Sequence, residues 1–424
     1  MDKHTLEGED PVRLCNYVDV YKNERITSAI PFSNATATDE EVRRFQLQAG
    51  DVLITKDSES WDDIAVPAFV EYTAPDLVCG YHLAILRAQE GVLDSNYLFR
   101  VQQCQPVSTQ YHVSANGITR YGLAHSAIKN ILLPVPPLCE QAAIGTFLDR
   151  ETAKIAALIA KQERMIALLG EKRQALIAHA VTKGLRPDAP MKDSGVAWLV
   201  EIPAHWKTTP LKFLVHMVSG GTPDKGNTDY WDGTIPWASA KDMKVEYLGD
   251  TEDHITQQAI NDRAARIVEP EAAILVVRGM ILAHTMPVAI NTVPLAINQD
   301  MKALIPGANL RSRYLAWQMR GLAETFLSRT DTAGHGTKAL REEDWSNIDL
   351  AVPPLDVQEC IAVHLDQETH RMDQLVEKTT HAIVLLREHR TSLIAAAVTG
   401  KIDVRGAAAG AEVDEAGALA GAAR

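Results

Sequence analysis

The sequence has few cysteines, no long apolar run and too little positive charge to balance its acids. Its five cysteines among 424 residues are Cys15, Cys79, Cys104, Cys139 and Cys360. They are scattered and form no CxxC pair, which indicates reduced thiols in a cytoplasmic protein rather than a disulfide framework or a zinc site. No apolar stretch reaches the length of a membrane span, and the first residues do not have the pattern of a signal peptide.

The formal net charge is −13, which argues against a protein that coats nucleic acid unaided. Residues 1–130 carry 11 Lys and Arg against 18 Asp and Glu, and residues 186–350 carry 17 against 21. A DNA-binding protein with such acidic domains has to concentrate positive charge on one face or obtain it from a partner. One basic stretch, residues 300–341, holds seven Lys and Arg against three Asp and Glu.

One stretch of the sequence occurs twice. Residues 135–182 and 352–399 align without a gap, at a constant offset of 217 residues. Of the 48 aligned positions, 23 are identical. Chance does not produce this similarity, so the chain consists of two copies of one plan.

Each copy predicts a long helix. Pro136-Pro137 and Pro353-Pro354 mark the helix starts, and a glycine beside a lysine marks each end. Apolar residues recur every three or four positions and form one stripe. The stripe comprises Ile144, Leu148, Ile155, Leu158, Ile159, Ile166, Leu169, Leu176, Ile177 and Ala180 in the first copy, and Ile361, Leu365, Met372, Leu375, Val376, Ile383, Leu386, Leu393, Ile394 and Ala397 in the second.

A helix over residues 150–182 would be about 50 Å long and could not bury its stripe alone. The other copy is the simplest partner, although each helix could instead pack on its own neighbouring domain. Residues 186–351 connect the end of the first helix to the start of the second most easily if these ends lie together. The sequence therefore predicts two antiparallel helices with a domain at either end of the rod.

Several phrases of the sequence carry a resemblance to a known family. In both copies V-P-P-L is followed by Q-x-x-I-x-x-x-L-D-x-E-T and by a helix that ends R-x-x-L-I-A-x-A-V-T. Between the copies stand KDSGVAWL (192–199), IPAHW (202–206), GGTP (220–223), YW (230–231) and IPW (235–237). From Pro11 to Arg405 these phrases make the chain similar to the specificity subunit of type I restriction–modification systems.

The resemblance implies a non-catalytic subunit of a type I restriction endonuclease and adenine methyltransferase complex. Such a subunit reads a split, asymmetric double-stranded DNA target and recruits methyltransferase subunits, here expected to be two, and restriction subunits through them. S-adenosylmethionine, ATP and Mg²⁺ are expected in the partner subunits, and no cofactor or metal in this chain. The implied location is the cytoplasm, without a membrane.

The implied fold is α+β, with two mixed α/β target-recognition domains joined by two long antiparallel helices. The helices form a coiled-coil spacer, and the whole has a pseudo-two-fold internal repeat. The expected divisions are a first target-recognition domain (1–134), a central repeat helix (135–185), a second target-recognition domain (186–351), a C-terminal repeat helix (352–405) and a disordered tail (406–424). The first domain has no counterpart of 198–206, so we expect it to be N-terminally short, either divergent or cut by the chosen start codon.

The two domains share a scaffold. Strands are expected at 51–55 and 81–86 in the first domain, and at 274–277 and 301–304 in the second. Helices are expected at 96–103 and 313–326. A polar, glycine-containing loop at 112–123 matches a similar loop at 332–340, and elsewhere the domains share little. Similar scaffolds with different surfaces suit two readers of different half-sites.

These two loops are the best candidates for DNA contact. Glycine lets the backbone approach a phosphate, and Thr119-Arg120 or Thr337-Lys338 supplies a hydroxyl and a cation. Arg120 could bind a guanine edge through two hydrogen bonds, whereas Lys338 suits a phosphate. The further cationic candidates are Lys56, Arg278, Arg329, Arg341 and Lys241. The alternative is that each loop is only a glycine turn before the last strand.

The helix starts are the candidate partner-binding sites. The residues predicted to dock methyltransferases are Pro136, Pro137, Leu138 and Gln141 in the first copy and Pro353, Pro354, Leu355 and Gln358 in the second. The sequence contains no Walker A loop, no HExxH motif and no Asn-Pro-Pro-Tyr-like tetrapeptide. Asp224, Asp242 and Lys244 have the outline of a metal nuclease site, but so short a pattern arises by chance. The main alternative is an interaction scaffold without a DNA role, which the acidic charge favours, and an enzyme is the third.

Overall fold

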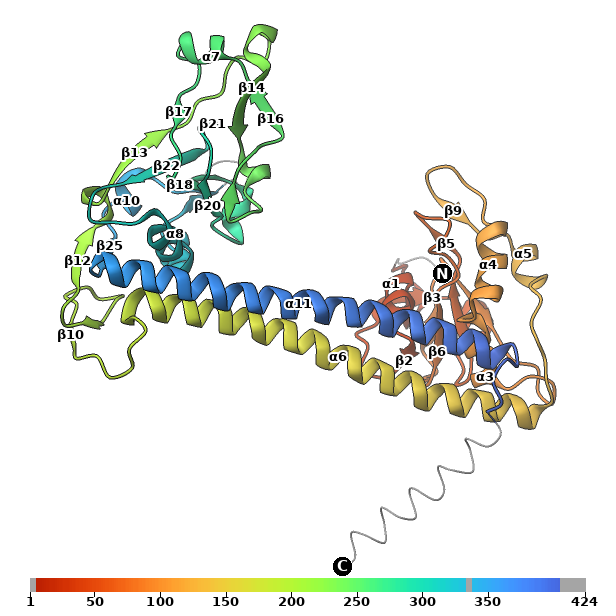
Figure 1. Cartoon of the computed structure of the whole chain (residues 1–424). Helices are drawn as coiled ribbons and strands as arrows, with labels where there is room; N and C mark the ends of the chain where they lie inside the picture. Colours follow the sequence, from red (N-terminus) through yellow and green to blue (C-terminus); the bar gives the residue numbers. More distant parts are fainter. Residues whose placement is uncertain (1–4, 333–337, 405–424) are drawn as a thin grey trace, which may run out of the picture. The chain divides into compact units, whose positions relative to one another are not determined.

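The computed structural model of the chain describes residues 5–332 and 338–404. The chain divides into two compact units, with residues 1–163 and 380–424 in unit 1 and residues 164–379 in unit 2. Each unit combines an α/β domain with one part of each of two long helices (Figure 1). The boundary between the compact units falls inside both long helices. The predicted domain boundaries at the helix starts are a different division of the chain and remain a prediction. Residues 406–424, predicted to be a disordered tail, lie outside the described residues.

The described part of the unit 1 domain has three small sheets. Its elements are β1 (Asp10–Cys15), α1 (Tyr17–Lys22), β2 (Arg25–Ile26), β3 (Ser33–Ala37), α2 (Asp39–Phe45), β4 (Val52–Thr55), β5 (Asp57–Ser58), β6 (Pro67–Val70), β7 (Leu77–Cys79), β8 (Leu83–Leu86), α3 (Ser95–Gln102), α4 (Gln105–Ser114), β9 (Tyr121–Gly122) and α5 (His125–Lys129). The strand orders are β3-β1-β7, β2-β6-β4-β8 and β5-β9. Buried aliphatic side chains of β4 and aromatic side chains of α3 contribute to its cores.

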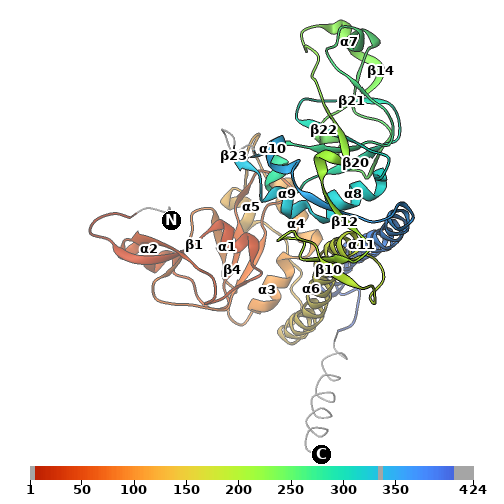
Figure 2. The ribbon, with the colours of Figure 1, turned by 90° about the vertical axis from the view of Figure 1, so that its left-hand side faces the viewer.

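The domain of unit 2 is larger. Its strands are β10 (Met191–Asp193), β11 (Glu201–Pro203), β12 (Lys207–Pro210), β13 (Val215–Ser219), β14 (Trp231–Ala238), β15 (Tyr247–Leu248), β16 (Asp253–Ile255), β17 (Ile267–Val268), β18 (Ala273–Val276), β19 (Arg278–Gly279), β20 (Val288–Asn291), β21 (Leu295–Ile297), β22 (Met301–Pro306), β23 (Asp331–Thr332), β24 (Lys338–Ala339) and β25 (Asp349–Val352). Its helices are α7 (Gln257–Asn261), α8 (Ser312–Gly321), α9 (Ala323–Leu327) and α10 (Glu342–Trp345), with short 3-10 turns η1 (Leu211–Phe213), η2 (Thr228–Tyr230), η3 (Ala240–Asp242) and η4 (Met280–Ala283). Figure 2 shows α7 beside β14, at the end of the sheet ordered β16-β14-β21-β17.

The strand pairings of the two units correspond. β1 pairs with β3 and β7 as β14 pairs with β16 and β21. β4 lies between β6 and β8 as β18 lies between β20 and β22, and the ribbon β5-β9 corresponds to β19-β24. Within the described residues, β12, β13 and the hairpin β10-β11 of unit 2 have no counterpart in unit 1. The predicted internal repeat is therefore present at the level of individual strand pairs.

The two long helices are α6 (Leu138–Lys183) and α11 (Leu355–Val398). Each starts directly after its proline pair, and each is followed by a glycine with positive φ, Gly184 at +76° and Gly400 at +70°. A glycine adopts this left-handed backbone without strain, so it ends the helix where the sequence predicted. Nothing after the prolines interrupts either helix, so α6 extends beyond the 150–182 stretch whose length was estimated.

The less exposed residues of each helix form a heptad seam. They are Leu148, Thr152, Ile155, Ile159, Gln162, Ile166, Leu169, Arg173, Leu176 and Ala180 in α6, and Leu365, Thr369, Met372, Val376, Thr379, Ile383, Leu386, Arg390, Leu393 and Ala397 in α11. Spacings of four and three alternate, which is typical of a left-handed coiled coil. Leu158 and Leu375, predicted to lie on the stripe, are 45% and 48% exposed, because the strict heptad period places Ile159 and Val376 in the seam instead.

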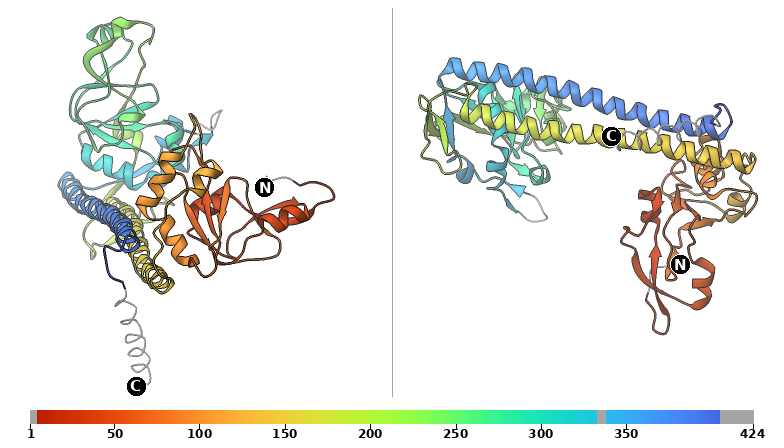
Figure 3. Two further views of the ribbon diagram at one scale, coloured as in Figure 1. Left: turned by 90° about the vertical axis from the view of Figure 1, so that its right-hand side faces the viewer. Right: turned by 90° about the horizontal axis from the view of Figure 1, so that it is seen from below.

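The helices run antiparallel. In unit 1, Ile144 and Leu148 near the start of α6 share a core with Ile394 and Ala397 near the end of α11. In unit 2 the end of α6 shares a core with the start of α11. Within each unit the two helix segments lie side by side (Figure 3). The predicted fold class, two mixed α/β domains with an antiparallel coiled-coil pair and an internal repeat, is confirmed.

Two local predictions were wrong. The expected loop at 112–123 begins inside helix α4, which extends to Ser114. The expected helix 313–326 is two helices, α8 and α9, separated at Leu322. A Cβ on Gly321 would lie 3.0 Å from Ile177 Cγ2 and 3.1 Å from Val181 Cγ2, so the end of α8 packs its backbone closely against α6. Among the described residues no helix is long and apolar enough to cross a membrane.

Candidate nucleic-acid interface and helix entrances

The short ribbon β5-β9 presents the first candidate DNA-contacting residues. Arg120 immediately precedes β9 and donates from Nη2 to Asp57 Oδ1 at 2.8 Å. The other carboxylate oxygen of Asp57 lies 2.6 Å from His82 Nδ1. The hydrogen bond to Asp57 raises the pKa of Arg120, while 58% of the arginine side chain stays exposed. The guanidinium is thus charged, oriented and accessible.

Other exposed groups surround this ribbon. Lys56 Nζ lies 5.1 Å from the centre of the Tyr81 ring, which is 56% exposed. Thr119 is exposed beside Arg120, and Ile118 is 93% exposed. A cation, a hydroxyl and an accessible aromatic face are groups that contact phosphates and bases. The sequence pointed to Lys56, Thr119 and Arg120 but missed Asp57, Tyr81 and His82, because their role depends on strands that are distant in sequence.

The corresponding ribbon of unit 2 also gathers cationic residues. Arg278 pairs with Ala339 and Gly279 pairs with Lys338 across strands β19 and β24. Arg278 is exposed, and so is Arg341, which follows β24 closely. The structure thereby brings Arg278, Lys338 and Arg341 to one ribbon, as Lys56 and Arg120 are brought together in unit 1. Thr337 lies outside the described residues.

Two predicted cations are placed differently. Lys241 lies in η3, which is not part of the ribbon β19-β24. Its side chain pairs with Glu252 at 3.1 Å and Asp253 at 2.9 Å. The hydrogen bond to Asp253 is the main cause that raises the pKa of Lys241. Arg329 donates from Nη1 to the Asp344 carbonyl at 2.8 Å. Two carboxylates around Lys241 cancel its charge, so this residue is a poorer DNA contact than Arg120.

The helix entrances are held by two equivalent glutamines. The side-chain oxygen of Gln141 accepts from Asp94 N at 2.8 Å, and its amide donates to the carbonyls of Val92 and Pro136. At the matching position of the second copy, the Gln358 oxygen accepts from Arg311 N at 2.8 Å, and its amide donates to the carbonyls of Asn309 and Pro353.

Both glutamine side chains are completely buried. They fasten the helix to the loop before α3 or α8, so they offer no surface to a partner. The other predicted partner residues differ: Pro137, Leu138 and Pro354 are exposed, Pro136 and Leu355 are half-buried, and Pro353 is buried. A pocket of about 450 Å³ beside Pro354 is also lined by His205 and Phe213.

A second repeated contact ties each domain to its helix segment. Asp149 of α6 accepts hydrogen bonds from Arg25, Asn96 and Arg100. Its equivalent Asp366 of α11 accepts from Arg313 and, at 2.7 Å, from the indole nitrogen of Trp317. When the alignment of the two copies is extended backwards without a gap, positions 96 and 100 match 313 and 317, so different residue types reach the same carboxylate. This is the aspartate of the repeated L-D-x-E-T phrase.

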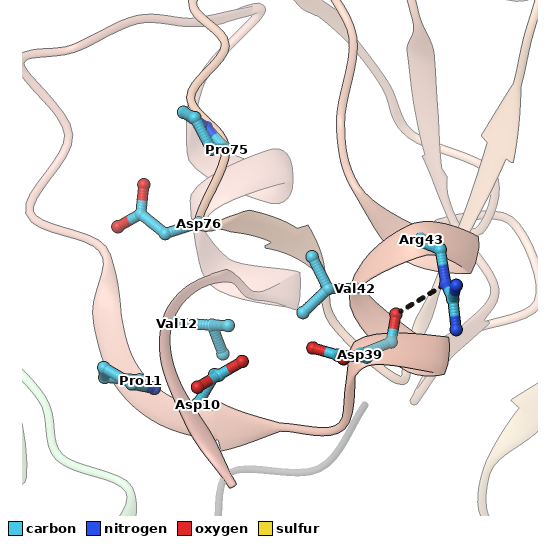
Figure 4. A pocket seen from close by; sticks show the side chains of 8 residues that line it. All are labelled: Asp10, Pro11, Val12, Asp39, Val42, Arg43, Pro75 and Asp76. Atoms are coloured by element: carbon cyan, nitrogen blue, oxygen red, sulfur yellow. Dashed lines mark hydrogen bonds between the residues drawn. The ribbon is translucent and has the colours of Figure 1, made fainter.

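Acidic groups elsewhere have local roles. The surface pocket beside β1 and α2 is lined by Asp10, Asp39, Asp76 and Arg43, with the Arg43 side chain directed to the Asp39 carbonyl (Figure 4). Three carboxylates make it unsuited to DNA phosphate. Asp242, part of the nuclease-like pattern, caps η3 by accepting from Ser239 N at 2.8 Å. The described residues contain no cluster of three or more His, Cys, Asp or Glu placed to hold a metal ion.

Comparisons with known proteins fit this architecture. Residues 203–383 match the family described as Type I restriction modification DNA specificity domain. The chain is 27% identical over 270 residues to the EcoR124I/EcoR124II specificity subunit of Escherichia coli, covering 62% of this chain and 60% of that protein. It is 20% identical over 343 residues to the putative MjaX specificity subunit of Methanocaldococcus jannaschii, covering 80% of this chain and 75% of that protein.

Solved structures share the fold. A chain from a type I restriction–modification system, studied for complex assembly and conformational transition, has a TM-score of 0.66 at 17% identity and covers 83% of this chain and 82% of its own. The HsdS subunit of Thermoanaerobacter tengcongensis has a TM-score of 0.57 at 17% identity and covers 93% and 92%.

The repeated domains and paired helices give the chain the fold of these solved type I restriction–modification chains. Residues 203–383 carry the similarity to the type I DNA specificity domain, and over more of its length the chain is similar to specificity subunits of type I restriction–modification systems. These relatives are specificity subunits by name, which agrees with the prediction that the chain is not an enzyme. The chain spans 60% of the length of the E. coli relative.

Proposed function

We propose that this chain reads a split, asymmetric DNA target, with one half-site read by each unit. The observation that carries the proposal is the repeated ribbon, β5-β9 with Arg120 and Lys56 in unit 1 and β19-β24 with Arg278 and Lys338 in unit 2. The same scaffold position bears different side chains in the two units. Different side chains at equivalent positions recognise different bases, which makes the target asymmetric.

The chain also recruits methyltransferase subunits, two in number, and restriction subunits through them. The net charge of −13 supports a need for partners, because acidic domains alone hold DNA weakly. The exposed residues Pro137, Leu138 and Pro354 at the helix entrances form part of the docking surface. S-adenosylmethionine, ATP and Mg²⁺ belong to those partners, where they serve methyl transfer and DNA translocation.

The coiled coil sets the length of the unread spacer between the half-sites. Its two helices have matching seams. A change in the length of one helix alone therefore disrupts the pairing, whereas equal changes in both preserve it. The length of α6 and α11 therefore determines the number of base pairs between the half-sites.

Sequencing of modified bases tests the proposal. The chain is co-expressed with the methyltransferase encoded beside it, in a host that lacks this modification. We expect one split motif with one methylated adenine on each strand. A soluble, co-purifying complex that modifies no DNA would contradict the reading function and favour the alternative of an interaction scaffold, which the acidic charge supports.

A further inference from the structure

Arg120 of unit 1 is held at both its backbone and its charged end. Its backbone lies in a loop that is closed by two hydrogen bonds between Asn116 and Gly122, at 3.1 and 2.9 Å. A Cβ on Gly117 would lie 1.9 Å from the Arg120 carbonyl oxygen, so the loop tolerates only glycine at this point. At the other end, Asp57 accepts a hydrogen bond from the guanidinium at 2.8 Å. The structure therefore orients this cation from two sides.

His82 takes up the rest of the Asp57 carboxylate. Its Nδ1 lies 2.6 Å from Asp57 Oδ2, a distance that requires the ring hydrogen to lie between the two atoms. The same Nδ1 lies 3.5 Å from Arg120 Nη2, and because it donates to the carboxylate it does not accept from the arginine. Asp57 is thus bonded through both oxygens, and only 16% of its side chain is exposed. This carboxylate holds the arginine and has no oxygen left for a base.

The guanidinium keeps one complete pair of donors. An arginine has two faces with paired N–H groups, Nη1 with Nη2 and Nε with Nη2. Asp57 uses one hydrogen of Nη2, so the face that contains the other Nη2 hydrogen stays available. Among the described residues, neither Nε nor Nη1 of Arg120 has a hydrogen-bond partner, and 58% of the side chain is exposed. Such a face matches the O6 and N7 acceptors of guanine in the major groove.

The charge balance at this site favours a base over a phosphate. The Asp57 carboxylate offsets the charge of Arg120, which weakens the attraction of a phosphate but leaves the donor geometry intact. The ribbon of unit 2 inverts this position. Asp57 pairs with Gly122, and Arg278 pairs with Ala339, which the alignment of the two copies places opposite Gly122. In the part of the chain that the structure describes, no carboxylate pairs with Arg278, so it keeps its full charge.

We propose that Asp57 is a positioning residue that holds Arg120 for the bidentate recognition of one guanine in the half-site of unit 1. The inference rests on the proposed reading function and names the base that this site takes. Arg120 touches the base, and Asp57 acts through it. The half-site of unit 1 therefore contains a G·C pair whose specification depends on an acidic residue that does not contact the DNA.

Sequencing of modified bases in the co-expressed methyltransferase complex tests the proposal. Arg120→Lys keeps the charge but removes the paired donors, so one guanine position should accept other bases, with discrimination reduced at least about fivefold. All other positions should stay specified. Arg278→Lys is the matched control, because it makes the same exchange on the ribbon of unit 2, and it should leave that guanine specified.

A positioning role for Asp57 has its own signature. Asp57→Asn keeps the shape of the side chain but removes the charge that holds and offsets Arg120. Discrimination at the guanine should fall at least about fivefold. Binding of the complex to a duplex without the motif should not weaken, and the slope of log K against log salt should steepen by about one, because a cation has been released. A purely structural defect would weaken binding to both duplexes.

The double variant completes the test. In the Arg120→Lys background, Asp57→Asn should cause little further loss of discrimination, because the bidentate contact is already absent. Losses that add in full would show that Asp57 acts independently of Arg120, which overturns the positioning role. A folded Asp57→Asn complex that keeps full discrimination overturns it as well.

The remaining outcomes separate the inference from the reading function. A split motif that keeps every position in Arg120→Lys overturns the guanine assignment and leaves the reading function intact. Relaxation at a position that is not a G·C pair has the same meaning, as does relaxation of the same guanine by Arg278→Lys. A wild-type complex that modifies no DNA overturns the reading function and the inference with it.

Discussion

The guanidinium of Arg100 donates from Nε to Asp149 Oδ1 at 2.9 Å, and only 3% of the arginine side chain is exposed. Burial lowers the pKa of Arg100. Asp149 is therefore the counter-charge of a buried cation, and it joins α3 to α6 within unit 1. Its equivalent Asp366 accepts from the neutral indole of Trp317 and pairs with Arg313, which is 35% exposed, so the same aspartate neutralises a buried charge in one unit and a partly exposed charge in the other.

Asp149→Ala should destabilise unit 1. It leaves Arg100 buried without its carboxylate partner, which costs about 2–3 kcal/mol, somewhat less than the about 3–5 kcal/mol of a fully buried pair because Asp149 itself is 36% exposed. Chemical unfolding followed by exchange of unit 1 amides measures the loss. Asp366→Ala is the control and should cost about 1–2 kcal/mol, because it removes the hydrogen bond from Trp317 and an ion pair with Arg313, whose 35% exposed side chain water can solvate. Larger losses for the control would contradict this account.

Arg120→Ala should weaken specific DNA binding by about 1–3 kcal/mol and relax the choice of base at one position of one half-site. Titration of the assembled methyltransferase complex with duplexes that differ at single positions measures both effects. Lys241→Ala is the matched control, because its two carboxylate partners already cancel its charge. An equal loss for both variants would show that bulk charge, and not the ribbon, governs recognition.

A paired deletion tests the spacer. Residues 163–169 and 380–386 are equivalent heptads of α6 and α11, and removing both keeps the seam in register. One heptad spans about 10 Å of helix, which corresponds to about three base pairs of DNA. Modified-base sequencing should find both half-sites unchanged and the spacer shortened by about this amount. An unchanged spacer in an active complex would refute the proposal that the coiled coil sets the spacer length.

Thiol reactivity should separate the cysteines by burial. Cys15, Cys79 and Cys104 are buried, and burial raises the pKa of Cys79 to about 12, so thiolate is scarce at these sites. Cys139 and Cys360 are exposed beside the helix entrances. Mass spectrometry after brief alkylation should find label on these two alone, and bound methyltransferase should reduce it. Undiminished labelling of Cys139 and Cys360 in the complex would show that the methyltransferase does not dock at the helix entrances.

The repeat made the long helices predictable from sequence. The glycines after each copy and the proline pairs before it set the ends of α6 and α11, and the apolar spacing gave most of the seam. Leu158 and Leu375 were misplaced because neighbouring apolar residues, Ile159 and Val376, satisfy the local pattern equally well. Only the heptad period accumulated over several turns distinguishes them.

The candidate site was predictable only in part. Arg120 and Lys56 were found because each is a cation beside a predicted strand or loop. Asp57 and His82 were missed, since their contacts with Arg120 join positions that are far apart in the sequence. Gln141 and Gln358 were read as partner contacts because a repeated polar residue at a helix start has the same pattern whether it faces outward or fastens a loop.

The hydrogen bonds of the buried glutamine at each helix entrance tolerate sequence change in the neighbouring loop. Gln141 and Gln358 bind main-chain atoms of the preceding loop, at Asp94 and Val92 in one unit and at Arg311 and Asn309 in the other. A main-chain contact is indifferent to the side chains that the loop carries. The loop before α3 or α8 can therefore change its side chains without losing the hydrogen bonds that hold it to the long helix.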